Sequence, residues 1–131
     1  MITARAPGKL MLAGEYAVAL SKAPALAVAV DRHVTVTVWE EAHVCGWRLS
    51  APDLGLKDAP PTHVPVVAAA VQAVGPRVHG HLRVESELGV GPDKPGLGGS
   101  AAITVAAMTA LCTLDGRQAP ALKDLVSAHR L

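Results

Sequence analysis

The segment from Lys94 to Ala102, Lys-Pro-Gly-Leu-Gly-Gly-Ser-Ala-Ala, has the composition of a loop that binds an anion. Its glycines, Gly96, Gly98 and Gly99, let the backbone approach a ligand closely and adopt positive φ angles. An apolar helix is expected to begin directly after the loop, and the first N–H groups of a helix have no partners within it. Because these groups and the helix dipole favour negative charge, the segment predicts a phosphate site.

The side chains after the glycines fit the same chemistry. Ser100 offers a hydroxyl to a phosphate or to its Mg²⁺, and the small Ala101 and Ala102 keep the approach open. A glycine-rich surface turn capped by Ser100 is the alternative, and spacing alone does not separate the two interpretations. Other phosphate loops fit less well. The chain has no G-x-x-x-x-G-K-[ST] string, and its relaxed dinucleotide fingerprint, from Gly96 to Ala101, does not directly follow the first strand.

The elements expected to position this loop follow an α+β pattern. Strands are predicted at residues 2–6, 9–13, 25–30, 34–39, 44–49 and 81–88, and helices at residues 63–74, 101–114 and 120–131. Pro7-Gly8 predicts a turn, Asp31 a strand boundary, Thr62 a helix N-cap, and residues 51–61 an irregular connection. The order predicts a two-layer α+β fold, a mostly antiparallel sheet with helices on one face.

Length and composition limit the function classes. The 131 residues suit one domain, spanning residues 1–131, and 50% of them are apolar, too many for a disordered chain. A net charge of +1 gives no general reason to bind nucleic acid or an anionic membrane. The sequence contains no apolar run of the length of about 18 residues that a membrane-spanning helix needs. The two cysteines, Cys45 and Cys112, form no disulfide framework and favour the reducing cytoplasm.

Two segments together resemble the GHMP family of small-molecule kinases. Residues 6–18, Ala-Pro-Gly-Lys-Leu-Met-Leu-Ala-Gly-Glu-Tyr-Ala-Val, resemble the family's first motif, and residues 95–102 resemble its second, the phosphate loop. Residues 24–31 resemble the strand between them. The resemblance implies ATP-dependent phosphoryl transfer, with Mg²⁺, to a mevalonate-type acceptor in isoprenoid precursor synthesis. It also implies the family's N-terminal domain, related to a ribosomal-protein fold, with a left-handed β-α-β unit.

Within the family, two features are more similar to phosphomevalonate kinases. One is the segment from Gly14 to Val18, since mevalonate kinases usually have His in place of Tyr16. The other is Lys94, directly before the loop. The resemblance therefore implies that phosphomevalonate is the acceptor, with mevalonate or the substrate of another family member as the alternative.

The resemblance assigns roles residue by residue. Lys9 matches the lysine near the transferred phosphoryl group, where a cation stabilises the charge that spreads over the phosphoryl oxygens. Glu15 and Tyr16 match positions on the acceptor side, and Ser100 matches the second loop serine, a Mg²⁺ ligand. Gly99 replaces the first loop serine, which removes one hydroxyl. The implied ATP contacts are Lys94, Gly96, Leu97, Gly98, Gly99, Ser100, Ala101 and Ala102. Without the motifs, Lys9 is an ordinary surface lysine, and Glu15 and Tyr16 are a polar strand end.

Other parts of the family's pattern are expected beyond Leu131: the catalytic aspartate, an acidic Mg²⁺ ligand, a third motif and the C-terminal domain. Asp115 and Asp124 follow the loop too closely to match that aspartate. The sequence therefore predicts a truncated kinase that is nearly inactive alone and self-associates through an uncovered apolar face. The alternative from another class is a non-catalytic fragment or interaction module with the same fold.

Three weaker signals favour structural roles. Trp39 and Trp47 flank a predicted turn and are expected to pack, with stacking on adenine as the alternative. The pair His79 and His81 has no evident carboxylate or cysteine partners for a metal site. Cys112, inside an apolar helix, is expected to be a small core residue.

Overall fold

The computed structural model describes residues 1–13, 24–89 and 96–129. Its five-stranded sheet has the order β1-β2-β5-β3-β4. The strands are β1 (Ile2–Ala13), β2 (Leu26–Glu40), β3 (Trp47–Ala51), β4 (Leu56–Ala59) and β5 (Gly80–Ser86). Neighbouring strands are antiparallel except β3 and β5, which are parallel. The helices are α2 (Pro65–Val74), α3 (Gly99–Leu114) and α4 (Leu122–His129), with 3₁₀ turns η1 (Pro52–Leu54) and η2 (Pro61–His63).

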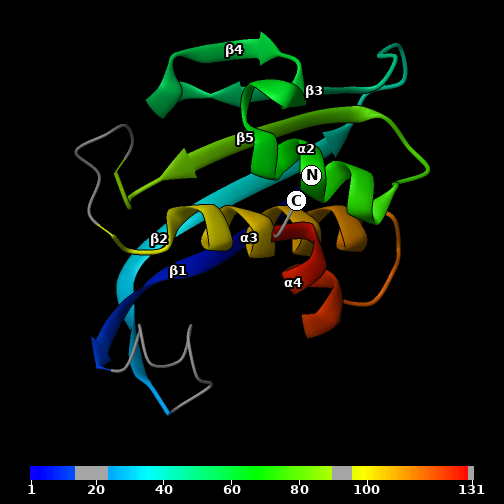
Figure 1. Cartoon of the computed structure of the whole chain (residues 1–131). Coiled ribbons are helices and arrows are strands. Elements are labelled where there is room, and N and C mark those ends of the chain that lie inside the picture. The colour runs from blue at the N-terminus through cyan, green and yellow to red at the C-terminus, as the bar shows by residue number, and fades with distance from the viewer. Residues whose placement is uncertain (14–23, 90–95, 130–131) are drawn as a thin grey trace.

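The helices lie on one face of the sheet, as Figure 1 shows. This arrangement confirms the predicted two-layer α+β fold with a mostly antiparallel sheet. The β3, α2 and β5 segments form a β-α-β unit with parallel strands. In the described part of the chain, no helix is long and apolar enough to cross a membrane.

The core lies between β2 and α3. Val34, Val36 and Val38 alternate along β2 with zero exposure, so every second residue of the strand faces the helices. Four alanines of α3 are also buried, and their small side chains let this helix pack closely on β1 and β2: Ala102, Ala106, Ala107 and Ala110. A core of valine, leucine and alanine is what a sequence without phenylalanine has available.

The predicted turn at Pro7-Gly8 is wrong, because β1 continues through it. β1 is an edge strand, so the missing N–H of Pro7 removes no necessary hydrogen bond from the sheet. The register with β2 shifts between Pro7 and Lys9, which marks a bulge or a similar irregularity. The predicted boundary at Asp31 is also wrong, since β2 runs unbroken past this exposed residue.

Several predicted boundaries move. Thr62 is not the N-cap of α2, because Pro61–His63 forms a 3₁₀ turn and Val64 is the N-cap, with Pro65 in the first helical turn. The predicted connection at residues 51–61 contains the short edge strand β4. The strand expected at residues 44–49 is Trp47–Ala51, and α4 begins at Leu122 rather than at Pro120.

Candidate phosphate site at the start of α3

The glycine loop ends on the N-cap of α3, as the sequence predicts. Gly98 has φ 72° and ψ 38°, a left-handed conformation that favours glycine. Its carbonyl accepts the first helical hydrogen bond, from the Ala102 N–H at 3.0 Å. No side chain of residues 1–13, 24–89 or 96–129 caps the helix, so within this part of the chain the first-turn N–H groups have no side-chain acceptor. Among the residues that the structure describes, a Cβ atom added at Gly96 or Gly99 would meet nothing within 4 Å, which leaves room for a ligand beside both glycines.

Lys9, from the other end of the chain, lies directly against this loop. Its backbone N–H donates a hydrogen bond of 2.8 Å to the Leu97 carbonyl. A Cβ atom on Gly98 would lie 3.2 Å from Lys9 Cε and 3.3 Å from its Cγ, so the lysine stem crosses the N-cap glycine. The two segments on which the family resemblance rests are therefore joined in space.

Gly8 explains how the strand and the loop come so close. A Cβ atom at this buried position would lie 2.9 Å from the Leu97 carbonyl oxygen and 2.6 Å from Leu88 Cδ2. The leucine side chain can move, whereas the backbone oxygen belongs to the hydrogen bond with Lys9. Pro7-Gly8 is thus a position of close backbone approach rather than a turn.

Ser100 has a partner that sequence reasoning missed. The Ser100 Oγ lies 3.1 Å from His129 Nε2, on the last turn of α4. The Ser100 carbonyl accepts a hydrogen bond of 3.0 Å from the Thr104 hydroxyl. His129 belongs to no motif, and only the return of α4 along α3 brings it to the loop. A groove of about 250 Å³ lies beside the pair, between α3 and α4.

The structure brings together eight of the predicted site residues: Lys9, Gly96, Leu97, Gly98, Gly99, Ser100, Ala101 and Ala102. Leu97 packs against the core and Ala102 is buried, so they anchor the loop from both sides. The predicted residues Lys94, Glu15 and Tyr16 lie outside the described residues.

The weaker candidates have structural surroundings. Trp39 stacks on His81 with ring centroids 4.8 Å apart, and its indole N–H donates to Glu41 at 2.9 Å. Trp47 is buried in the core. Burial raises the pKa of the Cys112 thiol, which disfavours the nucleophilic thiolate. Among the residues that the structure describes, no group of three His, Cys, Asp or Glu side chains is arranged to hold a metal ion.

Asp115 lies at the opposite end of α3 from the loop, as its C-cap. Its side chain is only 2% exposed and forms ion pairs with Arg77 and Arg117. The hydrogen bond from the Arg77 backbone N–H lowers the pKa of this carboxyl, and both guanidinium groups act in the same direction against its burial. Asp115 therefore joins the helix ends and has no place at the phosphate site.

Comparison with known proteins connects this fold to particular kinases. The chain is 35% identical to the mevalonate kinase of Methanothermobacter thermautotrophicus over 98% of its own length and 42% of that protein. It is 34% identical to the phosphomevalonate kinase of a Streptomyces species over 88% of its length and 38% of that protein. The fold matches Streptococcus pneumoniae phosphomevalonate kinase, solved in complex with phosphomevalonate and AMPPNP, with a TM-score of 0.79 and 19% identity over 98% of this chain and 41% of that one.

The chain spans about two fifths of the length of these relatives. No established protein-family model matches the sequence. The alignments with both curated relatives nevertheless cover most of the chain, and the shared fold agrees with them. The chain is therefore homologous to part of the mevalonate and phosphomevalonate kinases, whose fold it shares over this part.

Proposed function

We propose that the loop at the start of α3 binds the phosphates of ATP, and that the chain serves phosphoryl transfer from ATP to a small acceptor. The junction of Lys9 with Gly98 carries this proposal. It places a flexible cation beside uncapped helix N–H groups, on a loop whose other glycines open to solvent. Cations and backbone donors at one point are the elements that phosphate binding requires.

The same geometry supports a role in the reaction. Phosphoryl transfer depends mainly on positioning and on stabilising the charge of the phosphoryl oxygens in the transition state. The first-turn N–H groups of α3 would hold the phosphates, and the ammonium group of Lys9 would neutralise charge on the transferred group. Among the described residues, the cations of the ion pairs are arginines and histidines.

Mg²⁺ fits this site in part. The exposed Ser100 hydroxyl, in the first turn of α3, is an oxygen ligand of the kind that Mg²⁺ accepts. The described residues add no acidic cluster, so phosphate oxygens and water would supply further ligands. When bound, Mg²⁺ would neutralise phosphate charge, while Ser100 would hold it at the helix terminus.

Phosphomevalonate is the proposed acceptor, with mevalonate as the alternative. The preference rests on the segment from Gly14 to Val18 and on Lys94, all outside the described residues. The curated relatives carry both names at nearly equal identity. A non-catalytic module with this fold remains the competing class, and nucleotide binding without any turnover in the whole protein would favour it.

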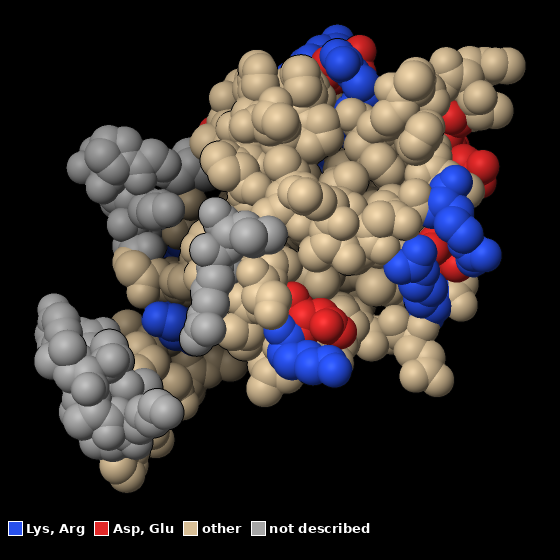
Figure 2. Space-filling view, turned by 45° about the vertical axis from the view of Figure 1, so that its right-hand side comes forward, with Lys and Arg blue, Asp and Glu red and all other residues tan. Residues whose placement is uncertain are grey.

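The proposed partners are small molecules, and the proposed location is the cytoplasm. The two cysteines are unpaired, Cys45 exposed and Cys112 buried, which suits a reducing compartment. On the described part of the face in Figure 2, Lys and Arg stand beside Asp and Glu in small groups and form no broad basic surface. That distribution supports a local anion site rather than nucleic-acid binding.

We also propose self-association of the chain through exposed apolar residues.

Calorimetric titration with ATP tests the proposed function when it is repeated on variants of two glycines that have the same backbone φ angle. Gly98 and Gly116 have φ of 72° and 73°, so Gly98→Val and Gly116→Val impose similar backbone strain at opposite ends of α3. A side chain at position 116 would meet nothing within 4 Å, whereas one at 98 would meet Lys9. We expect Gly98→Val to weaken ATP binding by at least about tenfold and Gly116→Val to leave it within about twofold.

A second variant keeps the test decisive if Gly98→Val unfolds. Gly99 has no positive φ and its Cβ would face open space, so Gly99→Val adds bulk at the proposed phosphate position without backbone strain. It is expected to weaken ATP binding while the thermal unfolding midpoint stays near that of the original chain. Unchanged affinity in both loop variants would show that the loop is only a turn.

A further inference from the structure

The last turn of α4 meets the phosphate loop through one side-chain contact. His129 Nε2 lies 3.1 Å from Ser100 Oγ, a hydrogen-bonding distance. His129 also lines the groove between α3 and α4, whose walls are mostly apolar. Ser100 and His129 are both exposed, so a ligand in solution can reach the pair.

Contacts with buried residues hold the backbone in place at both His129 and Ser100. Ala128, next to His129, is 2% exposed, and Leu125 packs against the core, so the last turn of α4 is fixed. On the other side, the buried Thr104 donates its hydroxyl to the Ser100 carbonyl at 3.0 Å. The contact therefore restricts the rotation of the Ser100 side chain, because neither backbone can easily withdraw.

The imidazole controls which groups the serine presents. A hydroxyl has one proton and two lone pairs. When Nε2 accepts the proton, both lone pairs stay available for a cation or water. When Nε2 carries a hydrogen, it donates to Oγ, and the serine proton is available to a phosphate oxygen. In both tautomers the Ser100 oxygen is held at the N-terminus of α3, where an anion would bind.

We propose that His129 is a positioning residue, which orients the Ser100 hydroxyl toward the phosphates of a bound nucleotide. The inference rests on the proposed function and deepens it by adding a residue that neither motif contains. His129 acts through Ser100, so its effect on nucleotide binding must depend on the presence of that hydroxyl.

A double-mutant cycle measures this dependence. ATP is titrated calorimetrically into the original chain, Ser100→Ala, His129→Ala and the double variant. His129→Ala is expected to weaken binding about threefold to tenfold, the effect of one hydrogen bond. The same substitution in the Ser100→Ala background is expected to cause no further loss, since coupled residues are not additive. Additive losses would show that His129 contacts the nucleotide independently and would overturn the positioning role, as would unchanged affinity in His129→Ala.

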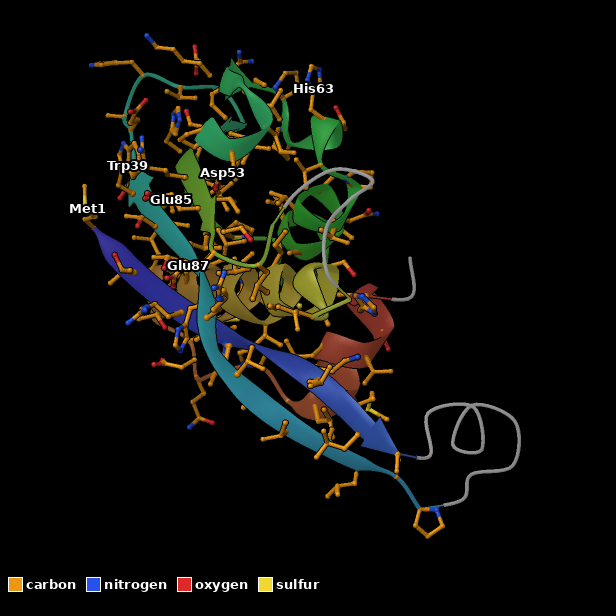
Figure 3. All side chains as sticks on the ribbon, turned by 90° about the vertical axis from the view of Figure 1, so that its left-hand side faces the viewer. Met1, Trp39, Asp53, His63, Glu85 and Glu87 are labelled. Atoms are coloured by element: carbon orange, nitrogen blue, oxygen red, sulfur yellow. The ribbon has the colours of Figure 1, made fainter. Side chains whose placement is uncertain are left out.

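Two further variants distinguish a positioning role of His129 from a general contribution to the stability of the fold. His129→Gln places an amide nitrogen near the position of Nε2 and is expected to recover most of the affinity. His63→Ala removes another exposed histidine, in η2 and away from α4 in Figure 3, and is expected to leave affinity unchanged. If His129 had only a structural role, His129→Ala would have a lower thermal unfolding midpoint, and His129→Gln would not recover ATP binding. That pair of results would overturn the proposal.

The histidine ring nitrogens report the contact without any nucleotide. In NMR spectra of the unliganded chain, the His129 Nε2 signal is expected to move on Ser100→Ala and to stay in place on Thr62→Ala. An unmoved signal on Ser100→Ala would overturn the inference. Failure of the original chain to bind ATP would instead overturn the proposed function, and the ring spectrum would still decide whether the pair exists.

Discussion

Lys9 combines two functions within one residue. Its backbone N–H donates to the Leu97 carbonyl, which fixes the loop on β1, while its side-chain stem packs on Gly98 and brings the ammonium group to the start of α3. A substitution of the side chain leaves the backbone hydrogen bond intact. The charge of Lys9 can therefore be tested without removing the support of the loop.

Lys9→Ala is expected to weaken ATP binding about tenfold, because a charge-assisted contact with a phosphate is lost from a partly solvated site. Lys9→Arg keeps the charge and is expected to lose about threefold or less. Lys123→Ala, on exposed α4, is the control and should not change the affinity. Calorimetry at low and high salt checks the cause, since screening reduces an electrostatic loss. Equal losses for the Ala and Arg variants, or none, would contradict the role of the charge.

At the scale of elements, sequence patterns predict what lies within a segment better than how segments meet. The valine alternation of β2 and the apolar run of α3 predict their types correctly. The turn predicted at Pro7-Gly8 is wrong because the same dipeptide suits both a turn and an edge strand that another backbone segment approaches closely. Only the position of Leu97 over Gly8 separates these cases.

The candidate site shows the same limit. The glycine loop and its helix were predictable from local composition, since each uses neighbouring residues. The contact between His129 and Ser100 was not, because it depends on how α4 returns along α3. The predicted Thr62 cap failed for a related reason, as the 3₁₀ turn before α2 occupies that residue.

The ends of α2 and α3 are joined by buried charge. Asp115 pairs with Arg77 and Arg117, and Arg117 also donates to the carbonyls of Val74 and Gly75 at the end of α2. Capping of these carbonyls by a cation suits the negative end of the helix dipole. This joint holds α3 in place from the end opposite the phosphate loop.

Asp115→Asn is expected to lower the thermal unfolding midpoint near neutral pH by a few degrees, because the partly exposed Arg77 and Arg117 lose their buried counter-charge. The native pKa of Asp115 is lowered from 3.8, so its stabilising contribution is complete above that value and is lost as the pH falls through the native pKa. The difference between the variant and the original chain should therefore shrink in acid.

Thermal unfolding followed by circular dichroism at several pH values checks this linkage. Asp124→Asn, on the exposed first turn of α4, is the control and should have little effect. A difference for Asp115→Asn that persists unchanged in strong acid would contradict an electrostatic origin.

At the scale of the whole molecule, the paired ends of β1 and β2 extend beyond the helical layer, as Figure 3 shows. Leu10 pairs with Val28 in register, and Leu12 and Leu26 lie nearer the end of the arm, where the register shifts between Met11 and Ala13. All four side chains are exposed, between 43% and 58%. An apolar strip of this kind favours association with another surface.

We expect the chain to self-associate through this strip. The double substitution Leu12→Thr with Leu26→Thr should reduce the apparent mass in sedimentation velocity experiments at a given concentration, because it removes two exposed leucines from the end of the arm. Leu54→Thr is the control, a leucine in η1 that is also about half exposed. A monomeric original chain, or the same reduction with Leu54→Thr, would contradict the prediction.

The central claim is that the start of α3 binds nucleotide phosphates, and amide NMR shifts during an ATP titration test it most directly. We predict saturable shifts that are largest at Lys9 and at residues 98–102, while the amide signals of Asp115 and Gly116, at the other end of the same helix, stay in place. The absence of saturable shifts, or shifts centred on Trp39 and His81 at the far end of β2, would contradict it.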